Sequence, residues 1–324
     1  MNASTRDKLI TIFGGTGFVG RYVVSALARQ GYRIRVITRD VVAASPLKTQ
    51  GEVGQIGCVY GDVKDTSHLA DWIEGSYAVV NLIGLLYESG AQRFSTIHTD
   101  AAHALAETAT KLNVQRFVHI SALGVDRASN SVYAQTKYAG EQAAHKAFPN
   151  ATILRPSVIF GAEDNFYNQF ARMAQFAPFL PLIGGGDAKF QPIYVMDVAD
   201  AVVRVIQKTE AMGNIYELGG DEVFSFKQIL QHICSITHRK PALLPLPFAL
   251  ANMIATFAQL LPAPFLTKDQ VTLLHYDNIV SSHALGCTHL GITPQSARVI
   301  VPLYLSRFHA PQPSSSLVSR TTHE

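Results

Sequence analysis

A glycine-rich turn between a short apolar run and a helical pattern constrains this chain more than any other feature. The apolar run Leu9–Phe13 is followed by the sequence FGGTGFVG and then by the helical pattern Phe18–Gln30. Gly14 permits a tight turn, Gly17 lets the backbone approach a pyrophosphate, and Gly20 lets the helix pack closely on the sheet. A helix that begins there presents free N–H groups and the positive end of its dipole to phosphate. The turn therefore predicts a strand–turn–helix unit that binds a dinucleotide.

The same alternation of apolar runs and helical patterns continues through the first half of the chain. Strands that alternate with helices form βαβ units, whose strands pair in parallel. The predicted fold class is therefore α/β, with a Rossmann-like doubly wound parallel sheet in residues 1–160. The further strands expected are Arg33–Thr38, Gln55–Tyr60, Ala78–Ile83, Arg116–Ser121 and Thr152–Arg155, and the helices expected are Thr66–Glu74, Arg93–Leu112 and Tyr133–Ala147.

The second half is less regular and predicts a smaller C-terminal α/β domain of the substrate type, residues 161–309, with segments that return to the sheet. Proline and glycine gather near Ala177–Gly186 and indicate loops. Residues 310–324 are rich in Ser, Thr and Pro, which predicts a disordered tail. The elements expected in this half are the helices Asn165–Phe176, Asp197–Lys208, Ser225–Thr237 and Pro294–Phe308 and the strand Ile215–Leu218.

The composition excludes several classes of protein. The formal net charge of +3 over 324 residues does not provide the dense basic face of a nucleic-acid-binding protein. The three cysteines, Cys58, Cys234 and Cys287, are far apart, which argues against a disulfide framework or a zinc site. The start MNASTRDKL has no apolar signal core, and no stretch of about 18 residues is continuously apolar without a proline. We therefore expect a cytoplasmic protein.

The tip of the second expected strand bears on which dinucleotide is bound. Arg39 and Asp40 are adjacent there, and Arg21 directly follows the last glycine of the turn. An acidic residue at this tip would accept hydrogen bonds from the ribose of NAD, whereas arginine would bind the 2′-phosphate of NADP. Two arginines favour NADP(H), with NAD(H) as the alternative if both are ordinary surface residues.

Further nucleotide contacts are expected at the carboxyl ends of later strands. Ligands of open α/β sheets bind beyond these ends, where Asp62 and Val63 follow the third strand and Asn81 to Gly84 close the fourth. The cofactor-binding residues predicted are Gly14, Thr16, Gly17, Phe18, Val19, Gly20, Arg21, Arg39, Asp62, Val63, Asn81, Ile83, Gly84, Tyr133, Lys137 and Pro156.

A candidate catalytic set lies in the next unit. Tyr133 and Lys137 are four residues apart and share one helix face, and Ser121 ends the preceding strand. A nearby ammonium lowers the pKa of a phenol, so Tyr133 could exchange a proton with a substrate oxygen beside nicotinamide. Ser121 would hold the substrate oxygen. The alternative is a chance Tyr-x-x-x-Lys spacing, or a pair that only binds the nicotinamide ribose.

Together these motifs resemble the short-chain dehydrogenase superfamily in its extended, epimerase-like branch. The stretches FGGTGFVGRYVV, VVNLIG, RFVHISALG, LRPSVIFGAEDNFYNQFARM and PLIGGGDAKFQPIYVMDVADAV more narrowly resemble the NAD(P)H-binding accessory subunits of respiratory complex I. This likeness extends from Leu9 to about Leu274, and FGAEDNFYN is its most discriminating part.

The narrower resemblance implies an accessory subunit that holds NADPH tightly on the peripheral arm, near the cytoplasmic side of a bacterial inner membrane, with little or no turnover. Its partners would be complex I subunits, without nucleic acid or metal. The complete Ser121, Tyr133 and Lys137 set leaves two alternatives. One is a reductase, epimerase or dehydratase acting on a nucleotide sugar or related carbonyl. The other is a soluble NADPH-sensing regulator.

One stretch suggests a docking surface. Between Lys240 and Lys268 there is no charged residue and no histidine, and prolines bracket a helix expected at Phe248–Leu261. Such a helix is about 21 Å long, shorter than a bilayer core of about 30 Å. It would be a core helix or would dock on a partner, and the lack of Lys or Arg argues against lipid binding. The histidine pairs His98/His103 and His283/His289 do not form a convincing metal site.

Overall fold

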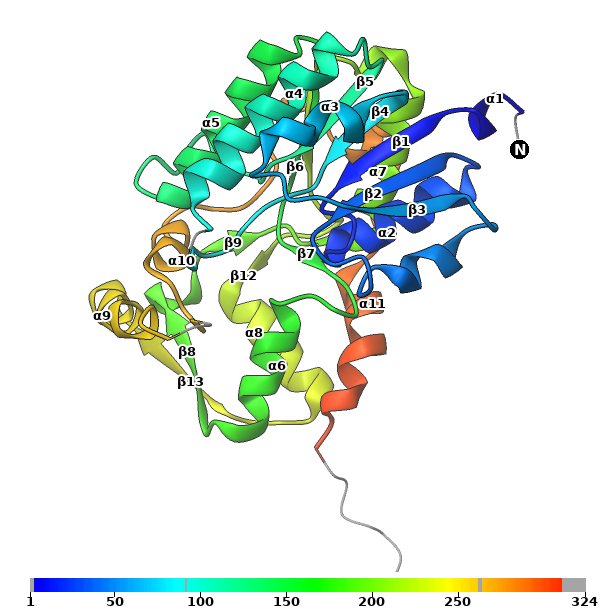
Figure 1. Cartoon of the computed structure of the whole chain (residues 1–324). Helices are drawn as coiled ribbons and strands as arrows, with labels where there is room; N and C mark the ends of the chain where they lie inside the picture. Colours follow the sequence, from blue (N-terminus) through cyan, green and yellow to red (C-terminus); the bar gives the residue numbers. More distant parts are fainter. Residues whose placement is uncertain (1–2, 91, 262–263, 311–324) are drawn as a thin grey trace, which may run out of the picture.

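The computed structural model describes residues 3–90, 92–261 and 264–310 and has a seven-stranded parallel sheet at its centre (Figure 1). The strand order is β11-β6-β5-β4-β1-β2-β3. The order reverses between β1 and β4, and Phe13 at the end of β1 is paired with Asn81 at the end of β4. The strands are β1 (Leu9–Phe13), β2 (Arg33–Thr38), β3 (Ile56–Tyr60), β4 (Ser76–Asn81), β5 (Arg116–Ile120), β6 (Thr152–Pro156) and β11 (Ile215–Leu218).

Helices cover both faces of this sheet. Alternate residues of a strand point to opposite faces, so Ile10 and Ile12 pack on one face while Phe13 packs on the other. The first face is covered by α2 (Phe18–Arg29) and α7 (Val195–Gln207). The second face is covered by α3 (Leu69–Ile73), α4 (Ala101–Lys111) and α5 (Val132–Ala147). The predicted α/β fold class, a doubly wound parallel sheet, is confirmed.

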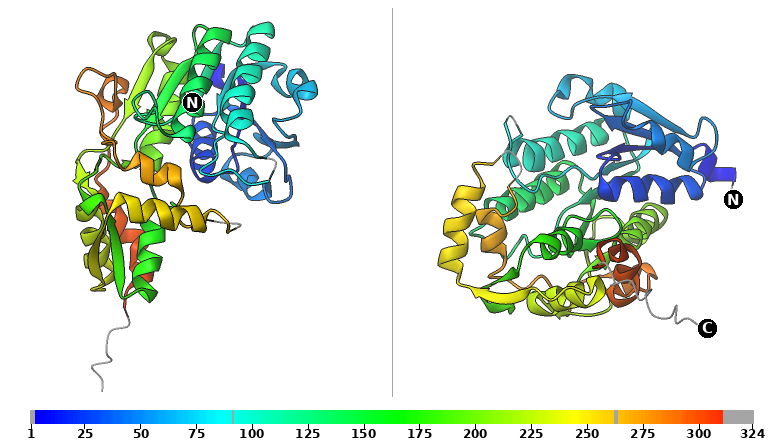
Figure 2. Two further views of the ribbon diagram at one scale, coloured as in Figure 1. Left: turned by 90° about the vertical axis from the view of Figure 1, so that its left-hand side faces the viewer. Right: turned by 90° about the horizontal axis from the view of Figure 1, so that it is seen from below.

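A smaller part lies below the carboxyl ends of the sheet strands (Figures 1 and 2). Its core is rich in aromatic rings, among them Phe160, Tyr167, Phe190 and Phe226. We keep the division at residues 160 and 161 as a proposal. The remaining elements are α1 (Ala3–Arg6), α6 (Tyr167–Phe176), α8 (Phe226–Thr237), α9 (Phe248–Ala258), α10 (Lys268–Leu273), α11 (Ala297–Leu305), and the strand pairs β7 (Ile159–Phe160) with β10 (Ile193–Tyr194), β9 (Lys189–Phe190) with β12 (Phe224–Ser225), and β8 (Phe179–Ile183) with β13 (Ala242–Leu246).

Several predicted elements differ from those observed. The segment Ala177–Gly186, predicted as loop, contains β8, and its partner β13 was not predicted. Both strands contain a proline, which a two-stranded sheet tolerates because each strand has a free edge. The single helix expected at Arg93–Leu112 begins instead as a π-helical turn, Ser95–Asp100, which continues as α4.

The predicted tail lies outside the described residues from 311 onward. Within the described ranges, no helix is long and apolar enough to cross a membrane. The helix α9 is shorter than the predicted Phe248–Leu261 and ends at Ala258.

Candidate functional site

The glycine-rich turn has the geometry that its sequence predicts. Gly14 has a φ of +83°, and a Cβ there would lie 3.0 Å from the carbonyl carbon of Leu82. A Cβ on Gly20 would lie 2.2 Å from the carbonyl oxygen of Gly14. Only glycine therefore fits either position, and the close approach at Gly20 is to the turn itself rather than to the sheet. The first turn of α2 begins at Phe18, just after β1, and the strand order reverses between β1 and β4.

The two charged residues at the end of β2, Arg39 and Asp40, differ in their contacts. The Asp40 carboxylate accepts a hydrogen bond of 2.9 Å from the Ala43 N–H, so it is engaged in its own turn. Arg39 is exposed and forms no ion pair or side-chain hydrogen bond within the described part of the chain. This arrangement leaves the guanidinium of Arg39 available to an anion.

A cleft of about 360 Å³ lies beside the glycine-rich turn. Thr16 and Arg21 line it, and the buried Nε of Arg21 has no hydrogen-bond partner. Tyr22 and Glu163 also line the cleft, and the Tyr22 hydroxyl donates a 2.7 Å hydrogen bond to the Glu163 carboxylate. Glu163 belongs to the FGAEDNFYN stretch, so this stretch reaches back to α2.

The segments after β3 and β4 lie at the same edge of the sheet. Val63 is buried, and Asp62 forms an ion pair of 3.4 Å with Lys64. Asn81 is almost completely buried, and its Oδ1 accepts a hydrogen bond from the Ile83 N–H. Asn81 therefore shapes the turn, while Gly84 is exposed at the surface of the site.

Ser121, Tyr133 and Lys137 are brought to this edge together. A Cβ on Gly84 would lie 3.9 Å from Lys137 Nζ, which connects the end of β4 to the face of α5. The buried Ser121 Oγ has no hydrogen-bond partner. Pro156 ends β6 next to them, and its carbonyl accepts a hydrogen bond from the Leu123 N–H.

The electrostatics of the pair differ from the sequence-based expectation. Lys137 Nζ donates a 2.7 Å hydrogen bond to the Ile120 carbonyl and is not bonded to the phenol. Burial lowers the pKa of Lys137 to about 8 and raises the pKa of Tyr133 to about 12. The prediction that the ammonium would lower the tyrosine pKa is therefore wrong for this conformation, because loss of solvation raises that pKa.

Two histidines that the sequence did not single out for this site lie beneath it. His98 Nε2 accepts a hydrogen bond from the Leu85 N–H, so the neutral ring donates through Nδ1 to Thr136 Oγ1. Burial lowers the pKa of His98 to about 3. The His98 ring lies 5.4 Å from the Tyr133 ring and stacks on Phe94 at 5.2 Å. His98 lies in the π-helical turn Ser95–Asp100, and π turns often lie at functional sites.

His119 is the second. Its Nδ1 lies 3.1 Å from Asn81 Nδ2, and its buried Nε2 has no hydrogen-bond partner. Burial, then the charge of Lys137, lowers the pKa of His119. No sequence signal identifies either histidine, because each depends on contacts between distant strands and helices. Across the described ranges, no group of three or more His, Cys, Asp or Glu side chains could hold a metal ion.

These features fit a nicotinamide dinucleotide. The turn at Gly14, Gly17 and Gly20 forms a cradle that a Cβ would fill, and Ser121 Oγ is a buried polar atom without a partner at the other end. A bound dinucleotide would supply hydride chemistry through its nicotinamide ring. The residues predicted to hold it lie at one edge of the sheet, except that Asn81 is engaged within the protein.

A protein-family model described as the NAD dependent epimerase/dehydratase family matches residues 10–219. The chain belongs to this family. It is 34% identical over 309 residues to NADH dehydrogenase (ubiquinone) 1 alpha subcomplex subunit 9, mitochondrial, of Arabidopsis thaliana, covering 91% of this chain and 77% of that protein. The mouse protein of the same name is 32% identical over 295 residues, covering 90% of this chain and 78% of that protein. Both resemblances drawn from the motifs are confirmed.

A solved structure supports the fold of this epimerase/dehydratase family member. An NADPH-dependent quinone oxidoreductase of Escherichia coli, complexed with NADPH, matches with a TM-score of 0.72 and 22% sequence identity. The match covers 91% of this chain and 99% of that chain. It shows that the sheet and the smaller part together form one known arrangement.

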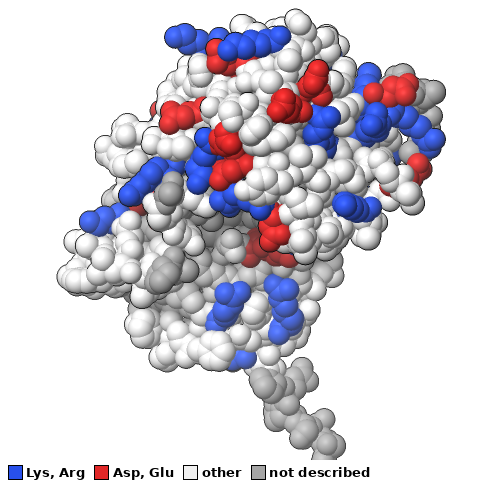
Figure 3. All heavy atoms as spheres, viewed as in Figure 1, with Lys and Arg blue, Asp and Glu red and all other residues white. Residues whose placement is uncertain are grey.

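The helix α9 presents an apolar surface. It buries three alanines, Ala251, Ala255 and Ala258, and exposes Met253 and Phe257, the latter at 67%. In Figure 3 the region of α9, at the lower left, shows no charged side chains, whereas charges of both signs are scattered over the upper part. The α9 surface comprises the exposed residues Leu250, Met253, Phe257, Leu260, Leu261 and Phe265.

Proposed function

We propose that this chain is an NAD(P)H-binding accessory subunit of NADH:ubiquinone oxidoreductase, respiratory complex I, with little or no turnover. The observation that carries the proposal is the similarity to two relatives named as subunit 9 of this enzyme, over 90% and 91% of the chain. The Tyr133–Lys137 pair fits a cofactor-binding role, because Lys137 donates its hydrogen bond to the Ile120 carbonyl and not to the phenol. The nucleotide would stabilise the folded chain by mass action, or report the redox state.

The preferred nucleotide in this proposal is NADP(H). Asp40 is occupied in its own turn, and Arg39 is unpaired within the part of the chain that the structure describes. Both facts favour a 2′-phosphate over a free ribose hydroxyl. Arg39→Ala should weaken NADPH binding by about tenfold while changing NADH binding by less than about twofold, because a charge-assisted contact contributes about 1.5–3 kcal/mol. Equal losses for the two nucleotides, measured by fluorescence titration, would exclude this role.

The partners proposed are complex I subunits, at the cytoplasmic side of a bacterial inner membrane. The α9 surface supports a protein contact, since contiguous exposed apolar residues mark interaction sites. The decisive measurement is a pull-down from gently solubilised membranes with identification of the bound nucleotide. Phe257→Ser on α9 should reduce recovery of complex I subunits, while Leu303→Ser on α11, a comparably exposed control, should not. A chain recovered alone would contradict the accessory role.

The second candidate is a reductase, epimerase or dehydratase of a nucleotide sugar or related carbonyl. The unpartnered, buried Ser121 Oγ favours it, because such an atom is suited to hold a substrate oxygen. Tyr133→Phe should then abolish turnover and leave cofactor binding intact. Absence of turnover with sugar nucleotides and quinones would count against it. A chain recovered with nucleotide and a partner other than complex I would favour a soluble NADPH-sensing regulator.

A further inference from the structure

The start of α5 is held by a residue from a distant part of the chain. Asp269, in the first turn of α10, accepts a 2.7 Å hydrogen bond from Ser131 Oγ and a 3.2 Å hydrogen bond from the Tyr133 N–H. Ser131 is fully buried and is the N-cap of α5, where its Oγ also accepts from the Ala134 N–H. The carboxylate therefore satisfies one of the free backbone donors of the helix that carries Tyr133 and Lys137, and it also holds the side chain that caps a second.

The charge of Asp269 and its position at the N-terminus of α5 both strengthen this contact. Hydrogen bonds to an ionised acceptor are stronger than neutral ones, and a carboxylate at a helix N-terminus also interacts favourably with the helix dipole. The same carboxylate lies in the first turn of α10, whose N-cap Thr267 is buried. Asp269 thus joins the N-termini of two helices that are far apart in the sequence.

Apolar packing beside the Asp269 carboxylate also connects α10 to α5. Leu273 and Tyr276, at and after the end of α10, pack on a small cluster that contains Ala134 of α5. On its other side, α10 packs through Val271 against Ala255 of α9. A continuous path therefore runs from α9 through α10 to the first turn of α5.

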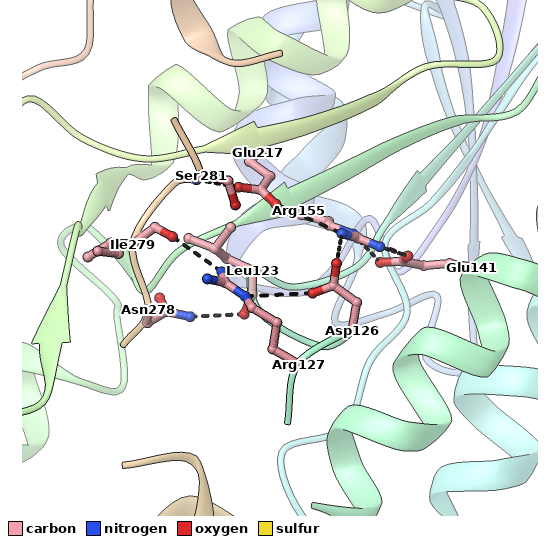
Figure 4. Close-up of polar contacts among 9 residues, drawn as sticks. All are labelled: Leu123, Asp126, Arg127, Glu141, Arg155, Glu217, Asn278, Ile279 and Ser281. Atoms are coloured by element: carbon pink, nitrogen blue, oxygen red, sulfur yellow. Dashed lines mark hydrogen bonds and ion pairs between the residues drawn. The ribbon is translucent and has the colours of Figure 1, made fainter. Parts of the chain in front are cut away.

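The segment after α10 makes a second attachment to the same site. Asn278 Nδ2 donates to the Leu123 carbonyl at 3.0 Å, two residues after Ser121 (Figure 4). The Arg127 guanidinium donates to the Ile279 carbonyl at 3.3 Å. These contacts hold the loop that carries Ser121, so α10 and its continuation touch both halves of the candidate site.

We propose that Asp269 is a positioning residue for the nucleotide site: it fixes the first turn of α5, and with it Tyr133 and Lys137, so that α10 and the nucleotide are coupled. The proposal rests on the proposed nucleotide binding. Coupling is reciprocal, so nucleotide should also stabilise α10. Apolar contacts made by α9 would then change nucleotide affinity through the same path.

The test compares NADPH dissociation constants of full-length variants. Asp269→Ala should raise the dissociation constant by at least about fivefold, the lower range of site-to-site coupling. Asp269→Asn keeps an oxygen acceptor but loses the charge, so its effect should be smaller than that of Asp269→Ala. In a Lys137→Ala background the effect of Asp269→Ala should become smaller, because part of it acts through Lys137 and the rest through Tyr133.

A matched control separates positioning from stability. Ser225→Ala removes the N-cap bond of α8, which packs in the aromatic core of the smaller part whereas α5 packs in other clusters, and it should lower the melting temperature without changing the NADPH dissociation constant. An Asp269→Ala variant that loses stability but binds NADPH normally would overturn the proposal. So would a loss that persists undiminished in the Lys137→Ala background.

A second measurement uses the unmodified chain and needs no variant to fold. NADPH should slow amide hydrogen exchange in α10 as well as in the first turn of α5, whereas protection of α5 without α10 would overturn the coupling. Failure of the unmodified chain to bind NADPH or NADH would overturn the proposed function together with this inference. Normal binding that is insensitive to Asp269 would overturn this inference alone.

Discussion

Replacing Arg155 by methionine should destabilise the protein by several kcal/mol, because it leaves a buried carboxylate without its partner. Arg155 lies in β6 with 6% of its surface exposed, and Glu141 of α5 is 1% exposed. The guanidinium donates through Nε and Nη2 to the Glu141 carboxylate at 2.9 and 2.6 Å, and through Nη1 to Asp126 at 2.7 Å (Figure 4). Glu217 lies 3.9 Å away as a third carboxylate.

The magnitude follows from burial and charge. Burial alone would lower the pKa of Arg155, but hydrogen bonds and charges from Glu141 and Asp126 raise it, so the guanidinium is always ionised. Breaking a buried pair by removing one partner costs about 3–5 kcal/mol. Such a loss is a large part of a total folding stability of about 5–15 kcal/mol. Urea unfolding followed by circular dichroism measures it directly.

Two controls make the Arg155 prediction specific. The double variant Arg155→Met with Glu141→Leu should recover part of the stability, because it removes the most buried of the carboxylates that lose the guanidinium while Asp126 and Glu217 remain. Lys111→Ala, which removes the exposed Lys111–Glu107 pair, should leave the stability almost unchanged. A loss below about 1 kcal/mol for Arg155→Met, or a double variant no better than the single one, would refute the reasoning.

Three further predictions follow from the site and its surroundings. Because the pKa of Lys137 is about 8, NADPH affinity should be constant below that pH and fall above it, by up to about tenfold per pH unit, and Lys137→Met should remove this dependence. Burial raises the pKa of Asp197 to about 6, so its contribution to stability is present below its ordinary pKa near 3.8 and is lost as the pH rises through 6. Asp197→Asn should therefore raise the melting temperature more at pH 8 than near pH 4, and an equal gain at the two pH values would contradict this cause. A Cβ on Gly140 would lie 2.0 Å from the His98 carbonyl oxygen, so Gly140→Ala should cost about 1–3 kcal/mol in urea unfolding, whereas Gly57→Ala, whose nearest neighbour is 3.9 Å away, should cost less; equal losses would contradict the steric reason.

The sequence predicted the parallel sheet because its signals are local. The turn at Gly14 to Gly20, the apolar runs and the helical patterns each depend on residues that are neighbours in the chain. Six of the seven strands of the sheet belong to the regular first half, and the seventh, Ile215–Leu218, was predicted with the same bounds. The small strand pairs escaped prediction because strands of two residues, or strands that contain proline, have no clear local pattern.

The candidate site was also predictable only in part. Ser121, Tyr133 and Lys137 follow from position and spacing, and the structure brings them to one edge of the sheet. The pKa values of Tyr133 and Lys137 do not follow from spacing. They depend on desolvation and on the hydrogen bond that Lys137 donates to the Ile120 carbonyl.

The sequence by itself determined the doubly wound sheet, the glycine-rich turn and the residues that face the carboxyl ends of the strands. Only the tertiary structure decided that Asp40 is engaged while Arg39 has no partner among the described residues, that His98 and His119 lie near Lys137, and that Asp269 caps α5. For the two histidines and Asp269 the physical reason is sequence separation, because their hydrogen bonds join residues 38 to 136 positions apart and are set by the packing of whole elements. The Asp40 bond spans only three positions, and there the conformation of the side chain decides.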